Sequence, residues 1–191
     1  MPTRPGRRSA AQAHAPLSLK ARAIALLAQR EHSEAELRRK LLRHARSLVD
    51  RQAGEGAPGE AAPGEAAAND PALRVDPVID WLRAEGHLSE TRFVESRVHA
   101  RAARFGNLRI RQELAQHGVE LPPEAAQALK ASELERATEV WRRKFGAAPV
   151  DAAQRARQSR FLAQRGFSAD VIARVMRDAG ARIGDEPASD P

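Results

Sequence analysis

The sequence predicts an all-α protein whose helices form several small cores in series. Helix start and stop signals recur along the chain, whereas no stretch alternates between apolar and polar residues with the period of two typical of strands. One helical motif occurs three times. The 191 residues include only five Phe, two Trp and no Tyr, fewer large aromatic side chains than one deep core usually contains. These observations favour a repeat protein over a single globule.

About nine helices are expected, and most have a start or stop signal. Ser or Asp often stands at the N-cap position, where its side chain accepts a hydrogen bond from an unpaired backbone N–H. Ser33 with Glu36, and Ser132 with Glu135, have the spacing of a capping box. Glycine follows several of the helices as a stop. The expected helices run from Ser18 to about Arg30, from Ser33, from Asp76–Pro77 to Gly86, from Ser89 to about Arg104, from Asn107 to His117, from Pro122–Pro123, from Leu134 to Phe145, from Asp151 to Gly166 and from Ser168 to Gly180.

Composition separates the helical regions from three other segments. The stretch "GEGAPGEAAPGEAAAND" is rich in Gly, Pro and Ala and cannot pack a core, so it predicts a disordered insertion. The N-terminal segment is basic and has no apolar run, so we expect a disordered tail and no signal peptide. The predicted organisation is a basic tail (1–17), two helices of a first repeat (18–49), the insertion (50–75), the third helix of that repeat (76–88), a second repeat (89–131), a third repeat (132–180) and an acidic tail (181–191).

The repeated motif comprises "REHSEAELRRKL", "ARFGNLRIRQEL" and "RGFSADVIARVM", which align without gaps. Each copy has a ring-bearing residue, a capping residue after it and two aliphatic residues spaced by four. We expect the ring to pack over the helix start and the aliphatic residues to pack on the preceding helix. If a unit consists of a long, a motif and a short helix, the third unit lacks its short helix and the helix at 134–145 is additional. The matched sets are His32, Ser33, Leu37 and Leu41; Phe105, Gly106, Ile110 and Leu114; and Phe167, Ser168, Ile172 and Met176.

No pattern in the sequence favours catalysis or a cofactor. Cysteine is absent, which excludes disulfides, thiolate metal sites and cysteine nucleophiles. There is no glycine-rich phosphate loop, and no two of the six histidines have the i, i+4 spacing of metal ligands. We therefore expect no enzyme, no cofactor and no metal ion. Other polar residues have structural explanations: Ser33 and Ser168 as helix caps, His32 as a ring over a helix start, and Glu139 with Arg143 and Arg109 with Glu113 as solvated ion pairs.

The charge distribution indicates an anionic partner. The chain carries a net charge of +7 and has a pI near 11.0. The tail to Pro16 carries +3, residues 50–76 carry −4 and residues 184–191 carry −3, which leaves +11 on the helical body. A basic body of this kind suits nucleic acid or an acidic protein surface.

Arg97, Arg101 and Arg104 are spaced four and three apart, so they form one stripe beside the expected buried face. These arginines either cover the core with their apolar stems or form a ridge that faces an anion. Comparable basic runs occur in other units. The candidate partner-binding residues are Arg38, Arg39, Lys40, Arg43, Arg97, Arg101, Arg104, Arg109, Arg111, Arg142, Arg143, Lys144, Arg157 and Arg160.

Three blocks of the sequence resemble the RecX family, the regulators of the RecA recombinase. They are "LLAQREHSEAELRRKL", "WLRAEGHLSETRFVESRVHARAARFGNLRIRQELAQHGV" and "RQSRFLAQRGFSADVIARVM". The resemblance implies tandem three-helix units in an elongated, curved array. It also implies a cytoplasmic monomer that binds the groove of the RecA–DNA filament and inhibits the recombinase, ATPase and coprotease activities in DNA repair and the SOS response. The family has no catalytic residues to transfer to this chain.

A second hypothesis is a direct, largely sequence-independent DNA-binding protein, because three-helix units with a basic helix resemble helix-turn-helix modules. Against base readout, the motif helices "EAELRRKLL" and "ADVIARVM" lack the mix of Asn, Gln and Arg that reads base edges. Weak contact with DNA phosphates is compatible with either hypothesis.

Overall fold

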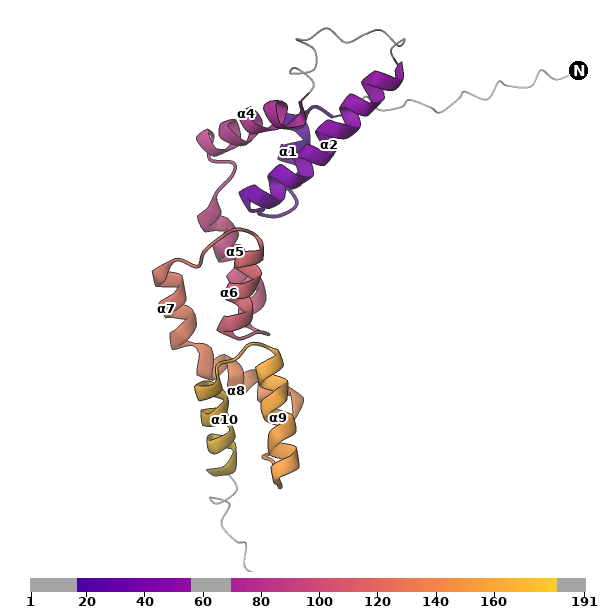
Figure 1. The fold of residues 1–191 in the computed structure, drawn as a ribbon. Coiled ribbons are helices and arrows are strands. Elements are labelled where there is room, and N and C mark those ends of the chain that lie inside the picture. The colour runs from indigo at the N-terminus through magenta and orange to yellow at the C-terminus, as the bar shows by residue number, and fades with distance from the viewer. Residues whose placement is uncertain (1–16, 56–69, 182–191) are drawn as a thin grey trace, which may run out of the picture.

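The computed structural model describes residues 17–55 and 70–181, and this part of the chain forms nine α-helices and no strand. The helices group in threes along one long axis, as Figure 1 shows, and the first group is inclined to the other two. The expected all-α, elongated and curved array is therefore confirmed. The helices are α1 (Leu19–Leu27), α2 (Glu34–Glu55), α4 (Pro71–Ala84), α5 (Glu90–Ala102), α6 (Asn107–Gln116), α7 (Pro123–Ala131), α8 (Glu133–Lys144), α9 (Ala152–Gln164) and α10 (Ala169–Ala181).

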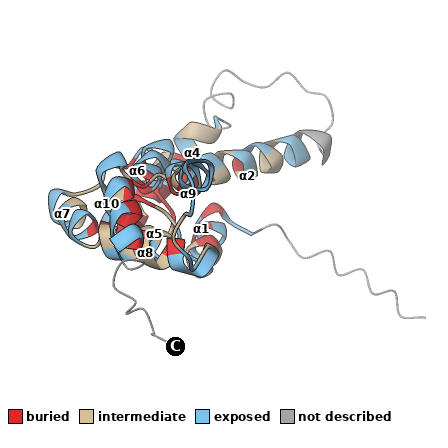
Figure 2. Ribbon diagram, turned by 90° about the horizontal axis from the view of Figure 1, so that it is seen from below, coloured by how far each residue is buried: buried red, intermediate tan, exposed pale blue. Residues whose placement is uncertain are grey.

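Each group of three helices encloses its own hydrophobic core. The first core lies between α1, α2 and α4, the second between α5, α6 and α7, and the third between α8, α9 and α10. Seen along the long axis in Figure 2, buried residues lie toward the inside of the units and exposed residues outside. The aliphatic residues of the repeated motif are all buried in these cores, as expected: Leu37, Leu41, Ile110, Leu114, Ile172 and Met176.

Local capping signals place most helix ends correctly. The side chains of Ser18, Ser33, Ser89 and Asp151 each accept a hydrogen bond from a backbone N–H in the first turn of the helix that follows. Of the predicted glycine stops, Gly86, Gly118, Gly146 and Gly166 have a positive φ, whereas Gly180 lies inside α10. One half of the predicted capping box at Ser33 is formed, because Glu36 donates its backbone N–H to that serine while its carboxylate binds Arg30 and Lys40.

The predicted start of a helix at Asp76–Pro77 is wrong. α4 begins one turn and a half earlier, at Pro71, where Asp70 accepts the Ala72 N–H at 2.9 Å. The two Asp-Pro pairs carry the same local signal, and the earlier one starts the helix. Residues 50–55 and 71–75 of the predicted insertion are therefore helical. Residues 56–69 of that insertion lie outside the described residues, as do residues 1–16 and 182–191 of the tails predicted at 1–17 and 181–191, whereas Ala181 ends α10.

The capping box predicted at Ser132 is also wrong. The Ser132 hydroxyl donates to Ala128 O at 3.1 Å, at the end of α7, and α8 begins at the next residue. The third unit uses α8 as its own first helix, because α8 shares a buried core with α9 and α10. The helix expected to be additional is thus part of the third unit, in which the motif helix stands third instead of second.

Candidate partner-binding surface

Four arginines gather on the solvent side of α2 and form what we call the α2 cluster: Arg38, Arg39, Arg43 and Arg46. They line a hollow of about 330 Å³. Arg38 is held by Asp76, with Nε 2.8 Å from Oδ1 and Nη2 3.1 Å from Oδ2. This hydrogen bonding raises the pKa of Arg38 and lowers the pKa of Asp76. Within the described part of the chain, no carboxylate forms an ion pair with the other three arginines.

Lys40 lies apart from the α2 cluster, although it is in the same helix. Its Nζ is 3.1 Å from Glu36 Oε1 and 2.8 Å from His32 Nε2. The opposite ring nitrogen of His32, Nδ1, donates to Arg30 O at 2.8 Å, so Nε2 is free to accept a hydrogen bond from the ammonium. This candidate therefore forms part of an internal network.

Arg97 and Arg101 of α5 both bind Glu113 of α6. Arg97 Nη1 donates to Oε1 at 3.3 Å, and Arg101 donates to the same oxygen through Nε at 3.0 Å and Nη2 at 2.8 Å. The predicted pair of Arg109 with Glu113 is absent from the described ion pairs, because the carboxylate faces α5 and not along its own helix. Both α5 arginines are half-buried, as expected for side chains that cover the core.

Three arginines surround Phe105 in the turn between α5 and α6, and we call this group the Phe105 cluster. The guanidinium carbons of Arg101, Arg104 and Arg109 lie 5.8, 5.7 and 5.2 Å from the ring centroid, within cation–π range. Arg104 and Arg109 are exposed, and no described carboxylate forms an ion pair with either. The adjoining hollow, of about 410 Å³, extends to His117.

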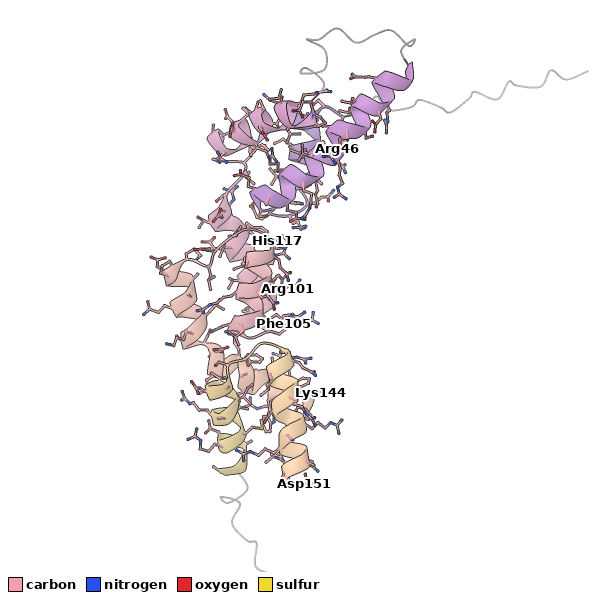
Figure 3. All side chains as sticks on the ribbon, in the orientation of Figure 1. Arg46, Arg101, Phe105, His117, Lys144 and Asp151 are labelled. Atoms are coloured by element: carbon pink, nitrogen blue, oxygen red, sulfur yellow. The ribbon has the colours of Figure 1, made fainter. Side chains whose placement is uncertain are left out.

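A further basic hollow lies where the second unit meets the third, and we call it the junction hollow. Its volume is about 230 Å³. Arg165 was not among the candidates predicted from the sequence, although it stands two residues before Phe167 in the third motif copy. Figure 3 shows basic residues following one another down the array, from Arg46 through Arg101, beside Phe105, to Lys144. The junction hollow is lined by Ala103, Arg104, Val140, Arg143, Lys144, Phe161 and Arg165.

Four further candidates lie outside these groups: Arg111, Arg142, Arg157 and Arg160. Arg142 Nη1 donates to Glu139 Oε1 at 2.5 Å, and Arg143 Nε approaches Oε2 of the same residue at 3.9 Å. The predicted pair of Glu139 with Arg143 is thus present but long. Arg111 lines a separate hollow beside the end of α6, and the two candidate arginines of α9, Arg157 and Arg160, are exposed.

Backbone hydrogen bonds fix the second unit against the third. Gly106 N donates to Arg165 O at 2.9 Å, and Leu108 N donates to Gly166 O at 3.1 Å. A Cβ at Gly106 would lie 2.2 Å from Gly166 O, so only glycine permits this approach. Gly166 itself has φ +78°. The glycine expected as a tolerated helix cap is therefore required by tertiary packing.

Two charged side chains, the buried Glu133 and the half-buried Arg136, reinforce the same junction. Glu133 accepts the Asn107 backbone N–H at 3.1 Å and the Ser168 hydroxyl at 3.3 Å, and so links motif starts in two units. Arg136 donates to Phe105 O at 2.8 Å and to Ala102 O at 3.0 Å, at the end of α5. Burial lowers the pKa of this guanidinium. Arg136 lay on the helix predicted at 134–145 and Glu133 directly before it, and no local signal distinguished either residue from surface charges.

The first and second units meet around Glu36. His117 Nδ1 of the second unit lies 4.0 Å from Glu36 Oε2, and its ring packs edge-on against Phe93 with centroids 5.4 Å apart. Arg92 spans the same boundary through an ion pair with Glu31 at 2.9 Å. The pKa of His117 is lowered, chiefly by burial and then by the charge of Arg97. The boundary is therefore polar, unlike the cores on either side of it.

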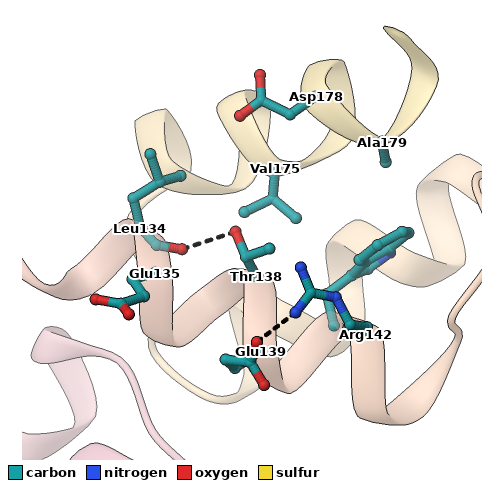
Figure 4. Close-up of a pocket in the computed structure, with 9 residues that line it drawn as sticks. Leu134, Glu135, Thr138, Glu139, Arg142, Val175, Asp178 and Ala179 are labelled. Atoms are coloured by element: carbon teal, nitrogen blue, oxygen red, sulfur yellow. Dashed lines mark hydrogen bonds and ion pairs between the residues drawn. The ribbon is translucent and has the colours of Figure 1, made fainter. Parts of the chain in front are cut away.

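A hollow between α8 and α10 is larger than the junction hollow, at about 430 Å³, and has mixed charge (Figure 4). Its acids are Glu135, Glu139 and Asp178, and its one base, Arg142, is already bound to Glu139. Across the described residues no cluster of acids and histidines has the geometry of a metal site, and no helix is long and apolar enough to cross a membrane.

Comparison with known proteins identifies the family. The second and third three-helix domains of RecX match residues 89–122 and 131–176. The regulatory protein RecX of Ralstonia nicotianae is 45% identical over 176 residues, which cover 90% of this chain and 96% of that protein. The RecX of Leptothrix cholodnii is 48% identical over 163 residues, or 84% of this chain and 88% of the relative.

Solved structures show the same fold. The crystal structure of RecX from Lactobacillus salivarius aligns with a TM-score of 0.58 at 16% identity, over 85% of this chain and 95% of that one. The relatives named here are described as regulatory proteins and not as enzymes. With its three-helix units, its separate cores and this similarity over nearly its whole length, the chain belongs to the RecX family of regulatory proteins.

Proposed function

We propose that this protein is a cytoplasmic inhibitor of RecA that binds as a monomer along the groove of the RecA–DNA filament. In this proposal it lowers the recombinase, ATPase and coprotease activities without chemistry of its own. The family membership supports a regulatory role, and the resemblance described above supplies RecA as the target. The proposed contact of the basic groups with the filament rests on the geometry of the surface.

One observation carries the proposal: basic side chains that form no ion pair within the described residues recur along an elongated array. Arg39 and Arg43 stand on the first unit, Arg104 and Arg109 on the second and Lys144 on the third, and no carboxylate in the described residues pairs with any of them. A filament repeats its protomers along an axis, so a long surface with recurring charge suits contact with several protomers at once. Arg97, Arg101 and Lys40 contribute less, because their charges are already neutralised within the fold.

The test is reversal of charge in the Phe105 cluster. The Arg104→Glu/Arg109→Glu double variant should lose most of its inhibition of RecA-driven ATP hydrolysis and the salt dependence of that inhibition, while its circular dichroism stays unchanged. The matched control is Arg174→Glu/Arg177→Glu, two exposed arginines of α10 outside the basic groups. It changes net charge equally and should inhibit normally. Equal inhibition by both folded variants would reject the proposed surface.

A second candidate function, direct binding to DNA phosphates, is favoured by the same unpaired arginines. It predicts binding to duplex DNA in the absence of the recombinase. The logarithm of the binding constant should then fall with the logarithm of salt concentration by roughly 0.9 for each phosphate contact. Duplex binding that is as tight as filament binding would favour this function over the first.

A further inference from the structure

We propose that the junction hollow binds an acidic polypeptide segment, with carboxylates paired to its rim of basic side chains and one aliphatic side chain placed against Val140 and Phe161. This inference deepens the proposed function, because it assigns a ligand chemistry to one part of the same surface. It concerns a defined hollow and can be tested without the recombinase.

The rim of the junction hollow is basic on three sides. Arg104 follows α5, Arg143 and Lys144 end α8, and Arg165 follows α9, so cations from two units converge on one point. No acidic side chain lines the hollow. Of these four cations, only Arg143 has an ion-pair partner among the described residues, at the long distance of 3.9 Å.

Helix stability explains part of this arrangement. A cation near a helix C-terminus interacts favourably with the partial negative charge there, and each of the three helices has one. That effect is local to each helix, however, and does not require the three ends to surround a common hollow. Their convergence leaves four positive groups close together, which is unfavourable in the absence of a counter-charge.

The floor of the junction hollow is apolar. Val140 is buried, with 8% of its surface exposed, and Phe161 is half-buried. Ala103 lines the rim with a side chain too small to cover this floor. An apolar floor inside a ring of cations fits a segment that alternates carboxylates with an aliphatic residue. Inorganic phosphate or sulfate would leave the floor in contact with water.

The state of the Phe161 ring argues against a nucleic acid in this hollow. The guanidinium carbon of Arg165 lies 3.7 Å from the ring centroid, and the Phe145 ring packs against Phe161 at 78° with centroids 5.0 Å apart. Single-stranded nucleic acid is bound by stacking bases on open aromatic faces. The Arg165 guanidinium already lies over the Phe161 ring, so that face is not open to a base. Arginine also pairs with carboxylates through two parallel hydrogen bonds, as an acidic peptide would require.

The hollow is held in shape by the junction itself. Its cations come from two units, and the backbone hydrogen bonds of Gly106 and Leu108 to the Arg165–Gly166 turn fix those units together. The distances between the cations therefore do not depend on side-chain packing alone. A rigid arrangement lowers the entropy lost on binding.

The experiment places a carboxylate in the hollow from within the chain. Ala103 is exposed, lines the hollow and has ordinary helical φ and ψ, so Ala103→Glu is compatible with the backbone. Its carboxylate should pair with the rim and exclude the ligand while the fold is retained. The matched control is Ala115→Glu, the same change at an exposed position of α6 outside this hollow.

The probe is a fluorescein-labelled peptide, Gly-Asp-Glu-Leu-Glu-Asp-Gly, followed by fluorescence anisotropy with the full chain. Replacing its leucine with serine should weaken binding roughly tenfold, because burial of one aliphatic side chain is lost. Ala103→Glu should weaken binding of the leucine peptide at least as much, whereas Ala115→Glu should bind within about twofold of wild type. Circular dichroism and melting temperature should be unchanged in both variants.

Three results would overturn the inference: equal binding of the leucine and serine peptides, equal loss in both variants, or displacement of the peptide by a twelve-residue oligo-dT at lower concentration than by unlabelled peptide. The assay also separates this inference from the proposed function. Absence of peptide binding by a chain that still inhibits RecA refutes only the assignment of this hollow. Peptide binding by a chain without effect on RecA refutes only the proposed function.

Discussion

Glu36→Gln should remove a specific part of the acid sensitivity of this protein. The Glu36 side chain is 6% exposed and lies where the first unit meets the second. Arg30 donates to both of its oxygens, at 3.1 Å to Oε2, and Lys40 Nζ lies 3.1 Å from Oε1. The change to glutamine keeps the shape of the side chain but removes the charge that both cations contact.

The magnitude follows from the pKa of this carboxyl. Burial alone would raise it, but the hydrogen bonds from Arg30 and Lys40 more than offset burial and lower the pKa of Glu36 from 4.5 to about 2. Each pKa unit corresponds to about 1.4 kcal/mol, so the carboxylate contributes on the order of 3 kcal/mol to the free energy of unfolding. Because the folded pKa lies below the unfolded one, this stability is present above about pH 4.5 and is lost as pH falls toward 2.

The assay is urea unfolding followed by circular dichroism between pH 7 and pH 2. The difference in unfolding free energy between wild type and Glu36→Gln should be about 3 kcal/mol at pH 7 and should approach zero near pH 2. Taking the difference removes the titration of groups distant from Glu36. The pKa of His32 is lowered chiefly by burial, but Glu36, 3.9 Å away, raises it, so the titration of His32 contributes to the difference.

The matched control is Glu34→Gln. Its carboxylate binds Arg83 but is 47% exposed, so the change should cost less than about 1 kcal/mol. A difference between wild type and Glu36→Gln that stays constant from pH 7 to pH 2 would refute the reasoning, because it would show that packing, and not charge, makes this residue important.

Other changes test the cores, the junction and the insertion. Ile110→Ala, at a fully buried position of the second core, should lower the free energy of unfolding by about 2–5 kcal/mol in urea titrations. Gly106→Ala places a Cβ 2.2 Å from a backbone oxygen of the third unit, so calorimetry should show that unit melting separately. The control Gly180→Ala, in open space within α10, should keep a single transition and raise the free energy of unfolding by about 0.5–1 kcal/mol. Replacing residues 56–69 of the predicted insertion with a shorter Gly/Ser linker should change the melting temperature little. Halving the length of a flexible loop changes the free-energy cost of closing it by only about 0.6 kcal/mol.

The local part of the fold was predictable from the sequence. A cap depends on residues within one turn, so Ser18, Ser89 and Asp151 identified helix starts correctly. The buried aliphatic positions of the three motif copies followed from helical periodicity, which also depends only on spacing along one helix. Where two equivalent local signals competed, as at Asp70 and Asp76, the sequence did not distinguish them.

The basic surface was predictable as a charge excess but not as an arrangement. Spacing along α6 suggested that Glu113 would bind Arg109, yet it binds the arginines of α5, because helices pack with that carboxylate turned toward the neighbour. Which arginines remain available to a partner therefore depends on contacts between helices. Arg165 joined the surface for the same reason, since its place in the junction hollow requires α8 and α5 beside it.

Most helix starts, the buried aliphatic positions and the basic character of the chain could be predicted from the sequence, because capping, periodicity and net charge are properties of short segments and of composition. The register of the third unit, in which α8 packs on α10 and completes the core, depends on contacts between helices. The requirement for glycine at position 106 is also tertiary, since the close approach of Gly166 O comes from a residue sixty positions away. Such contacts are set by packing between units, and no local pattern encodes them.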